Sequence, residues 1–334
     1  MISSSSEILP PVERKGILVL HRSGLPIARK VANANANATS ASQKQQQPPV
    51  YMFLSGFPDS SSTFDSFAKP FEEHFHVVKM SYPDMDEPCL GSFWGYSLRQ
   101  VEMALVAVIQ DYRCSDTYQC ETIFLHGFDW GAVVTLLTVH HYPTIVTKLI
   151  QQDVGIMKIE HMSLYNMIVI PSYQIYLAWI FLLSRIITLL LGNDDRLASR
   201  LLGFLPLCFP WFLLMTEGPK GGGGGGGGGD NENSVSFQML PHQCYPYFRV
   251  IVDMVTGHWP ELQFTPTVPQ FFAYGAKKNV SFHSKEYLTQ LESSSSSSCT
   301  PKCRVKAYSG SHWFHTTHEA EFQNDILDFL QDNE

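Results

Sequence analysis

The sequence predicts an α/β fold, in which a mostly parallel sheet is flanked by helices and carries an inserted helical cap. Three observations predict it. Buried strand patterns alternate with helical patterns, and one strand passes directly into a helix through a Gly-x-Asp-x-Gly turn. From residue 154 to about residue 259 the pattern becomes helical and apolar, and strands return after it.

The elements follow one another in a regular order. Short apolar runs predict strands at 16–20, 25–31, 49–56, 75–82, 121–127, 146–153, 267–275 and 304–310. Amphipathic or apolar helical patterns predict helices at 97–112, 131–143 and 319–330. Strand, helix and strand at this spacing indicate a parallel sheet with helices on both faces.

The same patterns divide the chain into parts. Residues 14–155 and 261–334 are expected to form the α/β core, and residues 156–260 the helical cap. Three low-complexity stretches, 32–49, 220–233 and 292–299, have too few apolar side chains to offset their ordering entropy. We expect them to be flexible surface inserts.

Composition excludes several classes of function. With 334 residues, 44% of them hydrophobic, the chain can bury a sizeable core. The net charge of −8 argues against nucleic acid and against a polyanionic substrate. The seven cysteines show no metal-ligand spacing and no paired pattern, and the first residues lack a secretory signal. We therefore expect a cytoplasmic protein with reduced thiols, without a metal or cofactor.

An apolar segment at 167–192 is long enough to span a bilayer, and a second apolar run follows at 201–215. Pro171 and Arg185 interrupt the first of them. We interpret these runs as cap helices over an apolar site, and contact of the cap with a membrane surface is the alternative.

The stretch Gly127-Phe128-Asp129-Trp130-Gly131 joins a strand to a helix without a linker. A turn this tight holds its central residue in strained geometry with the side chain exposed, and glycines on both sides leave room for the strand and helix to pack. An aspartate there lies beside a helix N-terminus, which stabilises its ionised form. This is the pattern of a nucleophile elbow that carries Asp129.

Three segments together resemble the α/β-hydrolase family, and within it the epoxide hydrolases and haloalkane dehalogenases, whose elbow carries Asp. The stretch FLSGFPDS resembles that family's HGxP motif, GFDWGA its elbow, and GSHWFHTTHEAEF its terminal segment with the catalytic histidine. Ser55 and Phe128 depart from the histidines usual in the first two motifs. From these departures we expect altered polarity of the site more than inactivity.

The residue at the elbow determines the chemistry. A carboxylate attacking an acyl carbon would give a reactive anhydride, whereas attack on an sp³ carbon with a leaving group gives a stable ester. The elbow therefore predicts a hydrolase that attacks such a carbon, in an epoxide or an alkyl halide, and forms an alkyl-enzyme ester on Asp129, which a histidine-activated water then cleaves. With the cap tyrosines considered below, the predicted reaction is the opening of an epoxide. The absence of serine at the elbow disfavours an esterase or lipase.

The resemblance implies the partners of Asp129. His312, between a predicted last strand and the closing helix, is the expected base. The backbone N–H groups of Phe57 and Trp130 are the expected oxyanion hole, with Pro58 fixing the loop.

The third member of the triad departs from the family's usual pattern. No carboxylate follows the strand at 267–275, and Lys278, interpreted as solvated charge, stands where one is expected. Asp153, after the strand at 146–153, occupies the other position that the superfamily uses, and a buried imidazolium needs a carboxylate partner. The alternative is that Asp153 only caps the next helix.

Cap tyrosines separate epoxide from halide chemistry, because epoxide hydrolases donate two hydroxyl hydrogen bonds to the oxirane oxygen. By resemblance, Tyr173 is the first. The segment expected to carry the second aligns best with Phe248 at the tyrosine position, which leaves Tyr247 or Tyr245 as candidates.

Two other functions stay open at this stage. One is a haloalkane dehalogenase, for which Trp130 is one halide donor and the sequence identifies no second. The other is a non-catalytic binding protein with the same fold, favoured by the missing acid after residue 275. For each of them, as for the epoxide hydrolase, the expected ligand is an apolar small molecule.

Overall fold

The computed structural model describes residues 7–8, 12–26, 28–29, 47–86, 92–114, 119–157, 160, 162–191, 195–205, 240–260, 265–294 and 301–332. Of the expected inserts, 220–233 lies outside these residues, as do most of 32–49 and of 292–299. Residues 292–294 belong to the last turn of helix α8 (Lys285–Ser294), where Ser294 is buried. The predicted cap and core boundaries stay predictions.

One large sheet organises the described residues. Its eight strands are β2 (Val12–Lys15), β3 (Leu18–Gly24), β5 (Val50–Leu54), β6 (His76–Met80), β7 (Ile123–Phe128), β8 (Lys148–Gln152), β9 (Gln270–Gly275) and β10 (Arg304–Tyr308). Their order is β10-β9-β8-β7-β5-β6-β3-β2; the pairs β2–β3 and β3–β6 are antiparallel, and the other neighbouring pairs are parallel. The predicted fold class is confirmed.

The strand predicted at 25–31 is the exception. Only residues 28–29 of it are described as a strand, β4 (Ala28–Arg29), and β4 pairs with β1 (Glu7–Ile8) in a separate two-stranded sheet. Residues 27, 30 and 31 lie outside the described part.

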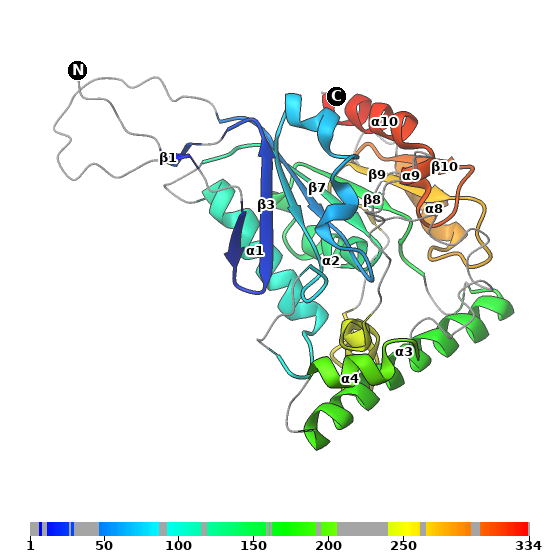
Figure 1. The fold of residues 1–334 in the computed structure, drawn as a ribbon. Coiled ribbons are helices and arrows are strands. Elements are labelled where there is room, and N and C mark those ends of the chain that lie inside the picture. Colours follow the sequence, from blue (N-terminus) through cyan, green and yellow to red (C-terminus); the bar gives the residue numbers. More distant parts are fainter. Residues whose placement is uncertain are drawn as a thin grey trace, which may run out of the picture.

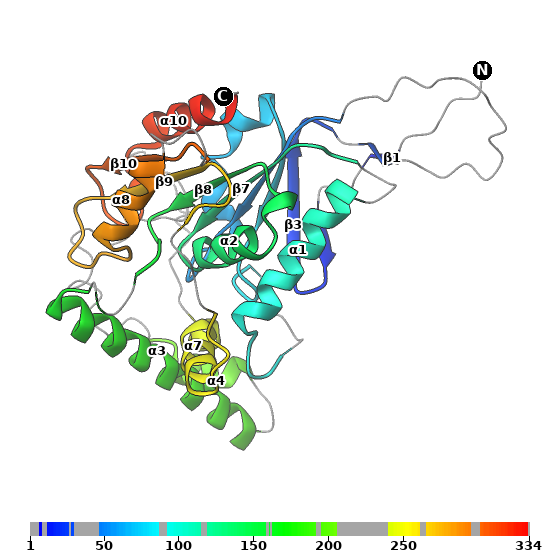
Figure 2. The ribbon, with the colours of Figure 1, turned by 180° about the vertical axis from the view of Figure 1, so that it is seen from behind.

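Helices cover both faces of the large sheet. Helices α1 (Leu98–Cys114), α2 (Trp130–His141) and α8 lie on the face seen in Figure 2. On the other face, seen in Figure 1, lie α10 (Glu319–Gln331) and the 3-10 segments η1 (Ser61–Phe64) and η2 (Lys69–Glu73). Because both faces are covered, every residue of β5 and β7 is buried.

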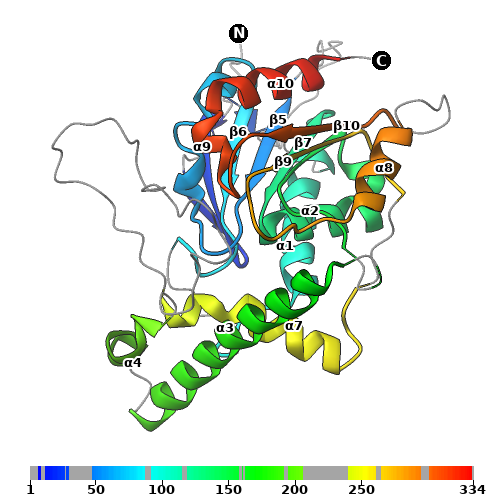
Figure 3. The same cartoon turned by 90° about the vertical axis from the view of Figure 1, so that its right-hand side faces the viewer.

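The helices inserted between β8 and β9 lie together at the end of the sheet where the parallel strands finish. They are α3 (Leu164–Leu190), α4 (Asp195–Leu202), η5 (Pro241–Cys244) and α7 (Tyr245–Val255). Figure 3 shows α3 and α7 crossing below the sheet. The apolar segment with its internal Pro171 thus forms a single long helix, α3, and Arg185 is buried against the rings of Phe93 and Phe181 at 5.1 and 5.0 Å.

One side of α3 is apolar and exposed. Its most exposed large side chains are Leu164, Ile168, Trp179, Leu189 and Leu190. Among the described residues α3 alone is long and apolar enough to cross a membrane, a test that core helices of soluble proteins also pass. Membrane-surface contact through the cap therefore stays a prediction, which co-sedimentation with neutral lipid vesicles tests.

Candidate active site

The elbow predicted around Asp129 is a real strand-to-helix turn. Asp129 follows β7 and precedes α2, with φ of 53° and ψ of −123°, a backbone conformation that is strained for any residue except glycine. A Cβ on Gly131 would lie 2.0 Å from the Leu54 carbonyl oxygen, and one on Gly127 would lie 2.2 Å from Thr135 Oγ1. Both glycines are needed because larger side chains would push α2 away from the sheet.

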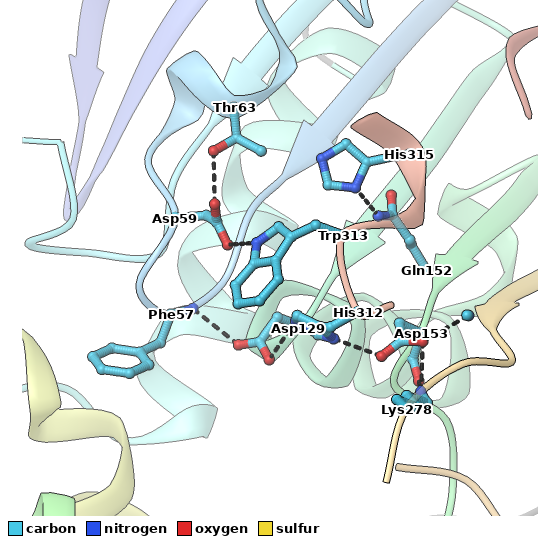
Figure 4. Close-up of polar contacts among 11 residues, drawn as sticks. Phe57, Asp59, Thr63, Asp129, Gln152, Asp153, Lys278, His312, Trp313 and His315 are labelled. Atoms are coloured by element: carbon cyan, nitrogen blue, oxygen red, sulfur yellow. Dashed lines mark hydrogen bonds and ion pairs between the residues drawn. The ribbon is translucent and has the colours of Figure 1, made fainter. Parts of the chain in front are cut away.

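Two backbone N–H groups lie beside the Asp129 carboxylate. Phe57 N donates to Asp129 Oδ1 at 3.0 Å, and the Phe57–Pro58 peptide bond is cis (Figure 4). The N–H of Trp130 lies against Gly56, since a Cβ on Gly56 would lie 2.2 Å from Trp130 N. The pair predicted as the oxyanion hole therefore flanks the elbow carboxylate.

His312 lies between the two predicted acids. Its Nε2 is 3.4 Å from Asp129 Oδ2, and its Nδ1 is 2.5 Å from Asp153 Oδ2. Asp153 follows β8 with a positive φ of 69° and is fully buried. It does not cap the next long helix, because Ser163 caps α3. The structure thus brings Asp129, His312 and Asp153 into one line (Figure 4).

Lys278 is not solvated, and that interpretation of the sequence was wrong. Its side chain is 5% exposed, and its Nζ is 2.5 Å from Asp153 Oδ1. Gly275 N donates to the same oxygen at 3.0 Å. Lysine is tolerated in the interior here because the carboxylate of Asp153, just after β8, compensates its charge.

Neighbouring charges set the protonation states of His312 and Asp153. Burial by itself would lower the pKa of His312, but the carboxylates of Asp153 and Asp129 outweigh it and raise that pKa to about 9. Burial would raise the pKa of Asp153, but Lys278 and His312 outweigh it and hold that pKa well below its usual range. In the resting site, His312 is therefore an imidazolium at neutral pH.

A cavity of about 400 Å³ lies between the elbow and the cap. Its lining is mostly apolar: Trp130, Val133, Val154, Gly155, Ile156, Met157, Ile170, Trp259, Pro260 and Phe282. Asp129 and the side chains of Tyr173, Gln174 and Tyr247 supply its polar groups. Among the described residues, no group of His, Cys, Asp and Glu that would hold a metal ion is found.

Tyr173 of α3 and Tyr247 of α7 meet at this cavity. Their ring centroids are 5.7 Å apart, and the Tyr247 ring also contacts Phe57 and Trp130 at 5.0 and 5.5 Å. Burial raises the pKa of both hydroxyls, and the Asp129 charge raises it further. Both tyrosines therefore stay protonated and able to donate at neutral pH.

The other two candidates for the second tyrosine position lie elsewhere. The hydroxyl of Tyr245 donates to the Pro83 carbonyl at 2.9 Å, and the ring of Phe248 packs on Trp94 and Phe181. Of Tyr245, Tyr247 and Phe248, Tyr247 is the one that lines the cavity.

Comparison with known proteins identifies the architecture. No protein-family model and no curated protein matches the sequence. Among solved structures, an epoxide hydrolase from Bacillus megaterium is similar with a TM-score of 0.58 and 15% identity, covering 96% of this chain and 100% of that one. An epoxide hydrolase from Vigna radiata is similar with a TM-score of 0.57 and 16% identity, over 98% of this chain and 97% of that one. A marine microorganism esterase is similar with a TM-score of 0.52 and 13% identity, over 97% of this chain and 100% of that one.

The chain has the α/β-hydrolase fold. This confirms the predicted architecture and the fold that the resemblance implied. Because both epoxide hydrolases and an esterase share the α/β-hydrolase fold at such low identities, the reaction has to be argued from the site itself.

Sequence reasoning missed a second buried carboxylate close to the elbow. Asp59 Oδ2 accepts from the Trp313 indole at 3.1 Å, and Asp59 Oδ1 accepts from the Thr63 hydroxyl at 2.9 Å (Figure 4). Burial raises the pKa of Asp59 to about 6, against the opposing hydrogen bonds of Trp313 and Thr63. Asp59 stands in the FPDS motif, but a side chain that anchors the neighbour of His312 leaves no signal in a single sequence.

The two unusual motif residues are both buried. Ser55 donates to the Asp59 carbonyl at 3.1 Å. The Phe128 ring lies between His312 and His315, with centroid distances of 4.8 and 5.0 Å. A phenyl ring at this place separates the charged His312 from His315. Burial, together with the charge of His312, lowers the pKa of His315 to about 3.

Proposed function

We propose that this protein hydrolyses epoxides through a covalent alkyl ester on Asp129. One observation carries the proposal: the elbow carboxylate and two buried tyrosine side chains line the same apolar cavity. A carboxylate attacks an sp³ carbon, and neutral hydroxyls stabilise and protonate the oxygen that leaves that carbon. An epoxide contains both the sp³ carbon to be attacked and, bonded to it, the oxygen that leaves.

In the first step an Asp129 oxygen forms a bond to one epoxide carbon. The ring C–O bond breaks, and its electron pair moves to the oxirane oxygen, which takes a proton from Tyr173 or Tyr247. The product is a hydroxyalkyl ester of Asp129 and one tyrosinate. The proton carried by His312 in the resting site is available to restore that tyrosine.

In the second step neutral His312 takes a proton from water, and the water oxygen bonds to the ester carbonyl carbon of Asp129. The N–H groups of Phe57 and Trp130 stabilise the resulting oxyanion. The intermediate collapses, the bond between the Asp129 carbonyl carbon and the alkoxy oxygen breaks, and the released alkoxide takes the proton from His312. The diol leaves, and the regenerated Asp129 carboxyl returns its proton to His312.

The cavity indicates the kind of substrate. Apolar side chains form most of its wall, and Asp129 is the acidic residue among the lining residues. An apolar epoxide, such as one on a lipid chain, fits a site of this polarity because burying its hydrocarbon part is favourable.

The tyrosine pair provides the experiment. Tyr173→Phe and Tyr247→Phe are each expected to lower kcat/KM for epoxides by about 10² to 10⁴-fold, because each removes one donor to the oxirane oxygen. Diol formation measured with a panel of apolar epoxides tests this. Tyr245→Phe is the matched control: its hydroxyl bonds Pro83 instead of facing the cavity, so activity persists. Equal activity of all three variants would contradict the proposal.

A halide substrate is the second candidate, and the structure supplies an observation for it. Trp259, like Trp130, lines the cavity, so two indoles are present where the sequence analysis identified one. Haloalkane chemistry uses the same ester on Asp129, with the halide ion as leaving group. Chloride release from apolar alkyl chlorides, insensitive to Tyr173→Phe, would favour this alternative.

A further inference from the structure

We propose that Lys278 is a positioning residue of this site: it fixes the Asp153 carboxylate on His312 and, once Asp129 is esterified, its charge lets His312 release its proton and act as the base. This inference rests on the proposed function. It concerns a residue at the place where the sequence led us to expect an acid.

The geometry ties Lys278 to His312 through one carboxylate. Lys278 Nζ binds Asp153 Oδ1 at 2.5 Å, and His312 Nδ1 binds Asp153 Oδ2 at 2.5 Å. With Gly275 N also on Oδ1, at 3.0 Å, both oxygens have buried partners. The carboxylate therefore has one orientation, and it holds the imidazole with Nε2 toward Asp129.

The count of charges explains why a cation is needed. In the resting site the carboxylates of Asp129 and Asp153 face two cations, His312 and Lys278, and the charges balance. Esterification removes the charge of Asp129. Asp153 then faces two cations, and the excess positive charge favours loss of the His312 proton. Without Lys278, Asp153 and His312 would form a balanced pair, and His312 would stay protonated and unable to activate water.

The other titratable groups around His312 do not replace this effect. Burial lowers the pKa of His315 to about 3 and that of His283 to about 4, so both imidazoles are neutral near neutral pH. Asp59 bonds the indole of Trp313, and burial raises its pKa to about 6. Ionisation of Asp59 therefore changes the charge near His312 at about that pH. The ring of Phe282 lies 5.3 Å from Lys278 Nζ and carries no charge.

The test measures His312 directly. Asp129→Asn replaces the carboxylate by a neutral group of the same shape, as esterification does, and NMR of ¹³C-labelled histidine follows the titration of His312, assigned by its absence in His312→Gln. Adding Lys278→Met to Asp129→Asn is expected to raise the His312 pKa by about one to two units. Lys278→Arg, which keeps the charge, is expected to leave it unchanged.

An unchanged or lower His312 pKa in Lys278→Met would overturn the inference. If Lys278→Met does not fold, Lys278→Gln, which can still donate to Asp153, gives the same comparison. Adding Asp59→Asn removes the part of the pH dependence of the His312 signal that comes from ionisation of Asp59 near pH 6. Because the titration needs no turnover, it is independent of the proposed reaction, whose own failure would be the absence of an ester on Asp129.

Discussion

Asp129→Asn is expected to abolish epoxide hydrolysis, with a loss of about 10⁴-fold or more in kcat, because an amide is not a nucleophile toward an sp³ carbon. The fold is expected to persist. Asparagine has the same shape as aspartate, so the substitution adds no atom to this turn and changes only the charge. Initial rates of diol formation, with circular dichroism and intact mass of the same sample, measure the effect.

The matched control is Asp59→Asn. Asp59 is a buried carboxylate near His312, but it bonds Trp313 and Thr63 and, unlike Asp129, does not line the cavity. An amide oxygen can still accept from the indole, so we expect most of the activity to remain. If Asp129→Asn, verified by mass, kept more activity than Asp59→Asn, the nucleophile would be misassigned.

Asp153→Asn is expected to cost about 3–5 kcal/mol of unfolding free energy, because it leaves Lys278 buried without its counter-charge. The loss should depend on pH. Since Lys278 and His312 hold the pKa of Asp153 below its usual range, its contribution is fully present above pH about 4 and is lost as pH falls further. Urea denaturation at a series of pH values measures the difference from the unmodified chain.

A double variant separates stability from function at this position. Asp153→Asn combined with Lys278→Met removes both buried charges, so we expect it to regain a large part of the lost stability. It is not expected to regain turnover, because His312 lacks its carboxylate. Additive losses in the double variant would show that Asp153 and Lys278 do not form a coupled pair.

Much of the core was predictable because its signals are local. The elbow shows itself through two glycines around Asp129, whose small size the turn needs. The segment around His312 is recognisable by motif and by its place before the closing helix. Asp153 was predicted because it stands at the other acid position that the resembled superfamily uses, after the strand that follows the elbow helix, and because a buried imidazolium needs a carboxylate partner.

The cap and the charge balance were harder to predict. Adjacent residues of a helix point about 100° apart, so the choice between Tyr247 and Phe248 depends on how α7 packs on α3. Lys278 follows β9 in a segment that looks like ordinary surface charge, and only the parallel pairing of β8 with β9 brings it to Asp153. A single sequence does not contain that pairing.

Intact mass spectrometry of His312→Gln, incubated with apolar epoxides, tests the central claim most directly. Without the base, the first step proceeds and the second stops, so the account predicts an adduct of the epoxide's mass on Asp129. The same variant carrying Asp129→Asn should show none. No adduct on folded His312→Gln from any epoxide or alkyl halide would contradict the covalent mechanism and favour a non-catalytic binding protein.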